Sequence, residues 1–205
     1  MEAISSSKHL IITTLLIIVA SSFSFTTEAT EKPYQQASTV FIKTSCSSTT
    51  YPRLCFASLV KHAESIQNDR LQLTCTALNV TLAAAKSTSA MISTMAKKQG
   101  MKPREVAAMQ DCVEVLSDSV DELRRSIAEL GNLKTSNFEM TMSDVQTWVS
   151  AALTDESTCT DGFQQQSEDA VNEDDKSAVR VRVVQTAQLT SNALALINRL
   201  ASSRG

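Results

Sequence analysis

The stretch PREVAAMQDCVEVLSDSVDELRRSIAEL, residues 103–130, decides the fold of this chain. Its apolar side chains recur every three or four residues, so on a helix they form one continuous stripe. The stripe consists of Met109, Val113, Leu116, Val120, Leu123, Ile127 and Leu130. Pro103 suits a first helical turn, whose amide needs no partner, and Gly131 follows as a stop signal. The stretch predicts a long amphipathic helix that packs against other helices.

Charged side chains occupy the opposite side of this predicted helix. They follow the same rhythm two residues out of phase, or about 200° around the axis at the helical repeat of 3.6 residues. This polar stripe consists of Asp111, Glu114, Asp118, Asp121 and Arg125. We expect it to face away from the core, either as a solvated surface or as a surface that binds a partner.

Three further segments show helical spacing. Residues 70–98 contain no Gly or Pro and precede Gly100. A third helix is expected to begin near Ser143, because Ser143 and Gln146 have the spacing of a capping box. A fourth is expected over residues 176–202. Four such helices with short connections favour an all-α fold, an antiparallel up-down-up-down four-helix bundle.

Trp148 lies on the expected third helix. Its helical phase matches that of Val145 and Ala152, so we expect it in the core. A place at a binding interface is the alternative, since one aromatic side chain can anchor either.

Shorter helical pieces precede the bundle and are interrupted at Tyr51-Pro52. Cys46 and Cys55 bracket this break. A disulfide between them would clip the two pieces into a helical hairpin and, in the chain-entropy model, contribute about 2.7 kcal/mol.

The N-terminus has the order of a secretory signal peptide. A charged opening around Lys8 precedes an apolar run over residues 10–20 and then small and polar residues as far as Ala29. The run is shorter than the roughly 20 apolar residues of a membrane span, so a retained anchor helix is the weaker alternative. We expect cleavage after Ala29. Two other small residues would also serve: Ser22 and Ser24.

The expected organisation is a signal peptide over residues 1–29, a hairpin extension over 30–68 and the bundle over 69–205. Removal of 29 residues from the 205-residue chain leaves 176, the length of one ordinary domain. The mature part carries 18 basic and 20 acidic residues, a net charge of −2. A chain this close to balance is expected to have no basic field with which to hold nucleic acid or an anionic polysaccharide, although a basic protein partner remains open.

The five cysteines all lie in the exported part of the chain: Cys46, Cys55, Cys75, Cys112 and Cys159. Most should be paired in an oxidising compartment, and one must be left over. Asn79-Val80-Thr81 is an acceptor sequence for N-glycosylation. Cys75 precedes Asn79 by four residues and shares its helix face, so a glycan at Asn79 would place this thiol near solvent. The hypothesis is that Cys75 is free and able to form a disulfide-linked homodimer; a partly buried, inert thiol is the alternative.

Catalysis and cofactor binding are not expected. The mature chain has one histidine, His62, and lacks the Gly-x-Ser-x-Gly, His-Glu-x-x-His and phosphate-loop motifs. The acidic residues of the helices are expected on outward faces. An acidic segment near the fourth helix consists of Glu168, Asp169, Glu173, Asp174 and Asp175. It lacks the alternating ligands and the central glycine of a calcium-binding loop. An apolar-ligand carrier is the third class open to a helical bundle.

Three motifs resemble the plant invertase and pectin methylesterase inhibitor family. They are CSSTTYPRLC at residues 46–55, DCVEVLSDSVDEL at 111–123 and DVQTWVSAALTDESTCTDGF at 144–163, and they occur in family order over the whole mature chain. The resemblance implies a disulfide between Cys46 and Cys55 and a second between Cys112 and Cys159, with the latter contributing about 4 kcal/mol. It also implies a non-catalytic protein inhibitor secreted into the apoplast and cell wall.

The expected target is pectin methylesterase, whose substrate cleft the bundle would occlude. Acid invertase, from the cell wall or vacuole, is the alternative target. Invertase-type members often carry Pro-Lys-Phe between the second and third bundle helices, whereas residues 131–138 read GNLKTSNF. The resemblance makes the polar stripe a candidate contact surface, together with four residues of the third helix: Gln146, Thr147, Ser150 and Thr154.

Overall fold

The computed structural model describes residues 31–164 and 173–204. The predicted signal peptide, Glu168 and Asp169 lie outside the described residues. The helices are α2 (Glu31–Cys46), α3 (Pro52–Leu59), η1 (Val60–His62), α4 (Ala63–Ile66), α5 (Arg70–Met95), α6 (Pro103–Gly131), η2 (Thr135–Asn137), α7 (Phe138–Gln164), α8 (Glu173–Ala201) and η3 (Ser202–Arg204). No strand occurs within these ranges.

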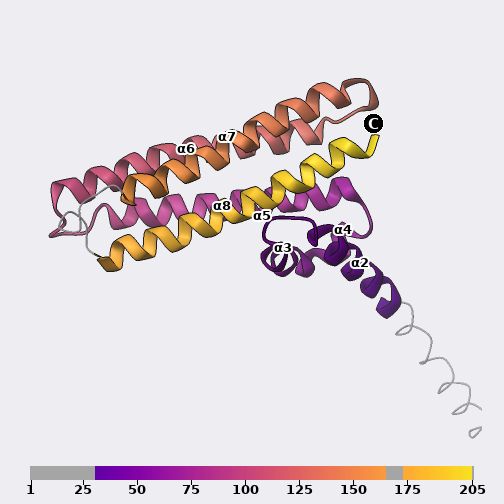
Figure 1. Ribbon diagram of the computed structural model, residues 1–205, viewed down its shortest axis with the longest axis horizontal. Helices are drawn as coiled ribbons and strands as arrows, with labels where there is room; N and C mark the ends of the chain where they lie inside the picture. The colour runs from indigo at the N-terminus through magenta and orange to yellow at the C-terminus, as the bar shows by residue number, and fades with distance from the viewer. Residues whose placement is uncertain (1–30, 165–172, 205) are drawn as a thin grey trace, which may run out of the picture.

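The four long helices α5, α6, α7 and α8 form an antiparallel bundle (Figure 1). Each packs against the helices before and after it in the chain, and α8 closes the ring against α5. The predicted fold class is therefore confirmed. None of the helices in the described ranges has the length and apolar character needed to span a membrane.

The core follows the apolar stripes of the four long helices. On α6, Met109, Leu116 and Leu123 have no exposed surface, while Val113 and Ile127 are half-buried. Burial of each such large side chain contributes about 1.5–3 kcal/mol. The long stripe thus ties α6 to the other helices over its whole length.

The N-terminal hairpin, α2 and α3 with the Cys46–Cys55 disulfide, packs on α5 and α8. Asn192 of α8 clips it in place, because its Oδ1 accepts from the Tyr51 amide and its Nδ2 donates to the Tyr51 carbonyl, both at 3.0 Å. Arg199 also donates to the Ser45 carbonyl at 3.0 Å. The turn at Tyr51 is thereby fixed to the bundle.

The start of the third bundle helix differs from the prediction. α7 begins at Phe138, and Ser143 lies inside it, where its carbonyl accepts from the Thr147 hydroxyl at 2.9 Å. The predicted capping box at Ser143 is therefore wrong. Burial explains the earlier start, since Phe138 and Met142 both pack into the core.

Two smaller differences concern α5 and Trp148. α5 ends at Met95, three residues before the predicted end, while Asp69 caps its start by accepting from the amides of Leu71 at 2.7 Å and Gln72 at 3.1 Å. Trp148 is only half-buried, and Val149 has no exposed surface.

Candidate functional site

The polar stripe of α6 is exposed along the helix. Asp111, Glu114, Asp118, Asp121 and Arg125 all lie at the surface. Asp121 is paired with Arg124, an exposed ion pair within one helix that adds little stability. The stripe therefore presents mainly unpaired carboxylates to solvent, on a helix whose other side is anchored in the core.

Three of the four candidate residues on α7 are also exposed: Thr147, Ser150 and Thr154. Their hydroxyl groups donate to the carbonyls four residues earlier, at 2.7–3.1 Å, and keep their lone pairs free to accept. Gln146 is placed differently. Its side chain is half-buried and donates to Oδ1 of Asn198 on α8 at 2.8 Å, so it already has a partner within the bundle.

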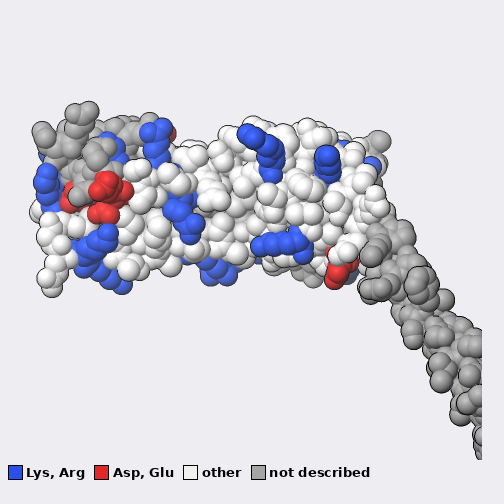
Figure 2. All heavy atoms as spheres, turned by 90° about the horizontal axis from the view of Figure 1, so that it is seen from below, with Lys and Arg blue, Asp and Glu red and all other residues white. Residues whose placement is uncertain are grey.

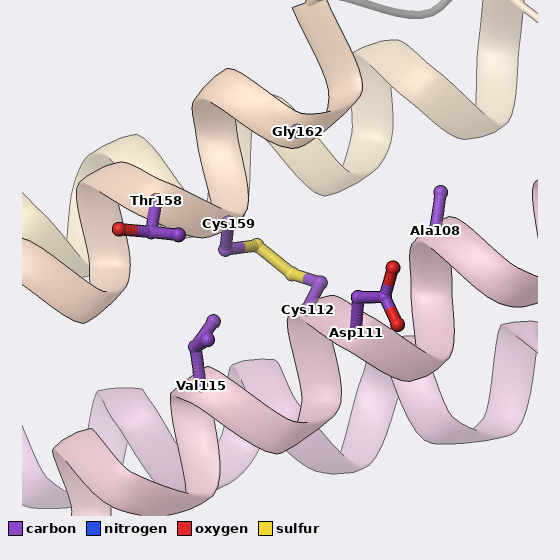
Figure 3. A pocket seen from close by; sticks show the side chains of 7 residues that line it. All are labelled: Ala108, Asp111, Cys112, Val115, Thr158, Cys159 and Gly162. Carbon is purple, nitrogen blue, oxygen red and sulfur yellow. A yellow bond between two sulfur atoms is a disulfide. The ribbon is translucent and has the colours of Figure 1, made fainter.

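The Cys112–Cys159 disulfide joins α6 to α7 at the floor of a shallow hollow. The hollow measures about 210 Å³, and Asp111, Val115 and Thr158 surround the disulfide (Figure 3). Both cysteines are almost fully buried. The covalent link fixes the spacing of the two helices where their polar residues meet, so the surface is rigid.

Two carboxyl groups that the sequence analysis did not single out meet between α6 and α7. Glu122 and Asp155 are half-buried and hydrogen-bonded to each other. Burial, followed by the charge of Asp155 and that hydrogen bond, raises the pKa of Glu122 to about 7. Burial also raises the pKa of Asp155. Both carboxyl groups therefore hold a proton more readily than exposed acids do.

Glu156 overturns the expectation that the acidic side chains of the helices all face outward. It has no exposed surface, and its Oε1 accepts from the Ser119 hydroxyl at 3.0 Å and the Thr190 hydroxyl at 2.9 Å. Its Oε2 is buried without a hydrogen-bond partner among the described residues. Burial is the main cause that raises the pKa of Glu156 to about 7. Its spacing of four from Ala152 was the available sequence signal.

Glu105 is the second buried acid of the bundle helices. Its Oε2 accepts from the Lys102 amide at 2.8 Å, so it caps the start of α6. The described residues contain no cluster of three or more metal-ligating side chains. The buried acids thus hold helices in place and form no metal-binding group there.

Asn79 and Cys75 lie about one turn apart on α5. Asn79 is exposed, and its Nδ2 donates to the Cys75 carbonyl at 2.8 Å. Cys75 is the free cysteine of the described chain and is half-buried. Burial, with a smaller contribution from the charge of Asp69, raises the pKa of its thiol. The reactive thiolate is therefore disfavoured.

Together, these features define a disulfide-stabilised helical bundle with an exposed, mostly acidic helix face. The sequence profile of the plant invertase/pectin methylesterase inhibitor family matches residues 40–196. The chain belongs to that family, as its three motifs predict, and the family consists of non-enzymatic inhibitors.

Similar proteins extend over nearly the whole chain. It is 42% identical to the 21 kDa protein of Daucus carota, over 96% of both chains. It is also 42% identical to pectinesterase inhibitor 9 of Arabidopsis thaliana, over 93% of this chain and 95% of that protein. A mutant form of an Arabidopsis pectin methylesterase inhibitor has the same fold, with a TM-score of 0.61 at 23% identity over 77% of this chain and 95% of that chain.

Proposed function

We propose that this protein inhibits pectin methylesterase by binding the enzyme through α6 and α7 and blocking its substrate cleft. The full-length similarity to a pectinesterase inhibitor supports this choice of target. Blocking a cleft requires matching shape and charge but no reactive group. The proposal therefore needs no catalytic residue in this chain.

The joined polar surface of α6 and α7 is the observation that carries the proposal. With the buried Glu105 and Glu156 left out, the two helices carry 10 acidic and three basic residues, a formal net charge of −7. A surface of one sign steers a partner of the opposite sign and sets its orientation. We infer that the enzyme presents basic groups around its cleft and that Asp111, Glu114 and Asp118 approach them.

Acid invertase is the second candidate target, because the family includes inhibitors of both enzymes. The connection between α6 and α7 lacks the Pro-Lys-Phe tripeptide of many invertase-type members, which favours the esterase. Residues 135–137 of this connection form the short helix η2.

One assay run twice separates the targets. The oxidised mature protein is titrated against a plant pectin methylesterase and against an acid invertase at the same pH and salt concentration. We expect loss of esterase activity alone. Loss of invertase activity alone would move the target to the alternative, and no effect on either enzyme would contradict the proposal.

We also propose that the protein acts in the apoplast after loss of residues 1–29 and that Asn79 carries a glycan. The signal-like N-terminus and the exposed position of Asn79 support these two points. Mass spectrometry of protein from a plant secretory system tests both. An N-terminus upstream of Ser22, or an unmodified Asn79, would contradict the respective point.

A further inference from the structure

Charge is strongly segregated along this chain. Residues 37–63, α5 and residues 176–201 together carry nine Lys and Arg residues and no Asp or Glu. A formal net charge of −7 lies on α6 and α7 when the buried Glu105 and Glu156 are left out. An overall charge close to zero therefore conceals two regions of opposite sign. The expectation that the chain has no basic field for an anionic polysaccharide rests on the net charge alone and does not take this distribution into account.

The basic segments form one side of the molecule. The hairpin packs on α5 and α8, and α5 packs on α8. Figure 2 views this side, with Lys and Arg spread along its length and the few Asp and Glu lying mainly near its two ends. We call it the basic side and define it by residues 37–63, α5 and residues 176–201.

The cations of the basic side are available to a ligand. Arg53, Lys61, Lys86 and Arg182 are exposed, and none of them forms an ion pair with another described residue. Arg182 reaches from α8 to the Ser87 hydroxyl of α5 at 3.3 Å, and the exposed Lys86 precedes Ser87 in the chain. The surface at this seam is thus continuous across two helices.

We propose that the basic side binds a linear polysaccharide that carries free carboxylates. Removal of methyl esters from pectin produces such a polymer, so this proposal rests on the proposed function and adds a second partner to it. While α6 and α7 bind the enzyme, the opposite side would hold the inhibitor on the polymer.

The spacing of charged and neutral groups favours a carbohydrate. Exposed hydroxyl side chains, such as Ser87 and Thr94 on α5, lie on the basic side together with the cations. Cations pair with carboxylates, and hydroxyl oxygens accept from sugar hydroxyl groups. A nucleic acid has a denser charge and is held by many phosphate contacts. Membrane binding needs an apolar helix face, but the large apolar side chains exposed on the basic side are Val40, Tyr51 and Val181, which lie on three different segments.

The acidic helices do not prevent this binding at moderate salt. Packed helix axes lie about 8–10 Å apart, and the Debye length is about 8 Å at an ionic strength of about 0.15 M. The repulsion between the acidic charges on the outer face of α6 and α7 and a polymer on the outside of α5 and α8 is therefore largely screened.

The experiment measures binding to polygalacturonate without any enzyme. The oxidised mature protein is run in affinity gels containing polygalacturonate, fully methyl-esterified polymer of equal length, DNA, or no polymer, and in a separate flotation assay with anionic lipid vesicles. The test variant is Lys61→Gln/Lys86→Gln/Arg182→Gln, with one change in each basic segment. The matched control is Arg104→Gln/Arg124→Gln/Lys134→Gln, which removes three exposed cations elsewhere.

We expect retardation by polygalacturonate only, about tenfold weaker binding in the test variant and little change in the control. Absence of retardation, equal retardation by the esterified polymer, stronger binding to DNA or vesicles, or equal losses in both variants would overturn the proposal. Esterase inhibition is assayed separately with a short uncharged ester substrate. The test variant should inhibit as strongly as the unmodified protein. Failure of the unmodified protein to inhibit the esterase would contradict the proposed function, not the binding of the polysaccharide.

Discussion

The hydroxyl group of Thr190 on α8 donates to the carboxyl group of Glu156 on α7 at 2.9 Å, in a position with no exposed surface. Ser119 of α6 donates to the same oxygen at 3.0 Å. One carboxyl group thus links three of the four bundle helices. Its other oxygen has no partner among the described residues, so the neutral acid fits this site better than the carboxylate.

Protonation of Glu156 should make stability depend on pH. The pKa of this group is about 7 when folded and 4.5 when unfolded, so between these values the folded state binds more protons. Stability should therefore fall as pH rises from about 4.5 to 7, by about 3 kcal/mol from this group alone. Urea unfolding at pH 5 and pH 8 measures the change.

Two variants isolate the contribution of Glu156. Glu156→Gln cannot ionise at this position, so its free energy of unfolding should change less between pH 5 and pH 8 than that of the unmodified protein. A remaining decrease is expected from Glu122, whose pKa is also raised to about 7. Glu114→Gln removes an exposed carboxylate of α6 and should retain the pH dependence of the unmodified protein. Equal pH dependence in all three proteins would contradict the assignment.

Removal of the disulfide between α6 and α7 should be costly. Cys112 and Cys159 close a loop of 47 residues, so Cys112→Ala/Cys159→Ala should lower the free energy of unfolding by about 4 kcal/mol in the chain-entropy model. Cys46→Ala/Cys55→Ala should cost less, because that loop spans nine residues. The reverse order in urea unfolding would show that loop length does not control the effect.

Asn192→Ala should release the hairpin from the bundle. It removes both hydrogen bonds to the Tyr51 backbone and should cost about 1–3 kcal/mol. Faster hydrogen exchange at the Tyr51 amide is the specific measurement. Asn198→Ala removes an exposed hydrogen bond from the same helix and should cost under about 0.5 kcal/mol. Unchanged exchange at Tyr51 in the first variant would contradict the clip.

Neutralisation of the polar stripe should weaken esterase inhibition. Asp111→Asn/Asp118→Asn should raise the inhibition constant roughly three- to tenfold and reduce its dependence on salt. Gln72→Lys/Gln185→Lys changes the net charge by the same amount at exposed positions of α5 and α8. This control should inhibit normally, and an equal effect of both variants would reflect net charge rather than contact.

Cys75 should remain a free thiol and the protein should remain a monomer, because burial disfavours the thiolate of Cys75. Non-reducing electrophoresis should give one band at the monomer mass, and a thiol reagent should label the folded protein far more slowly than the unfolded one. A band at twice that mass, absent from Cys75→Ser, would establish the disulfide-linked dimer instead.

Helical periodicity predicted most of this fold because each long helix needs one apolar side. The stripe on residues 103–130 identified the face of α6 that is buried, and Gly131 and Pro103 marked its ends. The start of α7 was missed because Phe138 and Met142 are held helical by burial, whereas local capping at Ser143 suggested a later start. Local signals predict helix ends poorly where packing extends a helix.

The amino-acid order alone determined the four amphipathic helices, the outward position of Asp111 and Asp118, and the family to which the chain belongs. Only the tertiary structure decided that Glu156 lies between three helices and that Gln146 bonds to α8. It also brought the basic segments to one side, because charges distant along the chain share a surface only after helices pack. Periodicity acts within one helix, while burial and electrostatic fields depend on neighbours that a linear pattern does not specify.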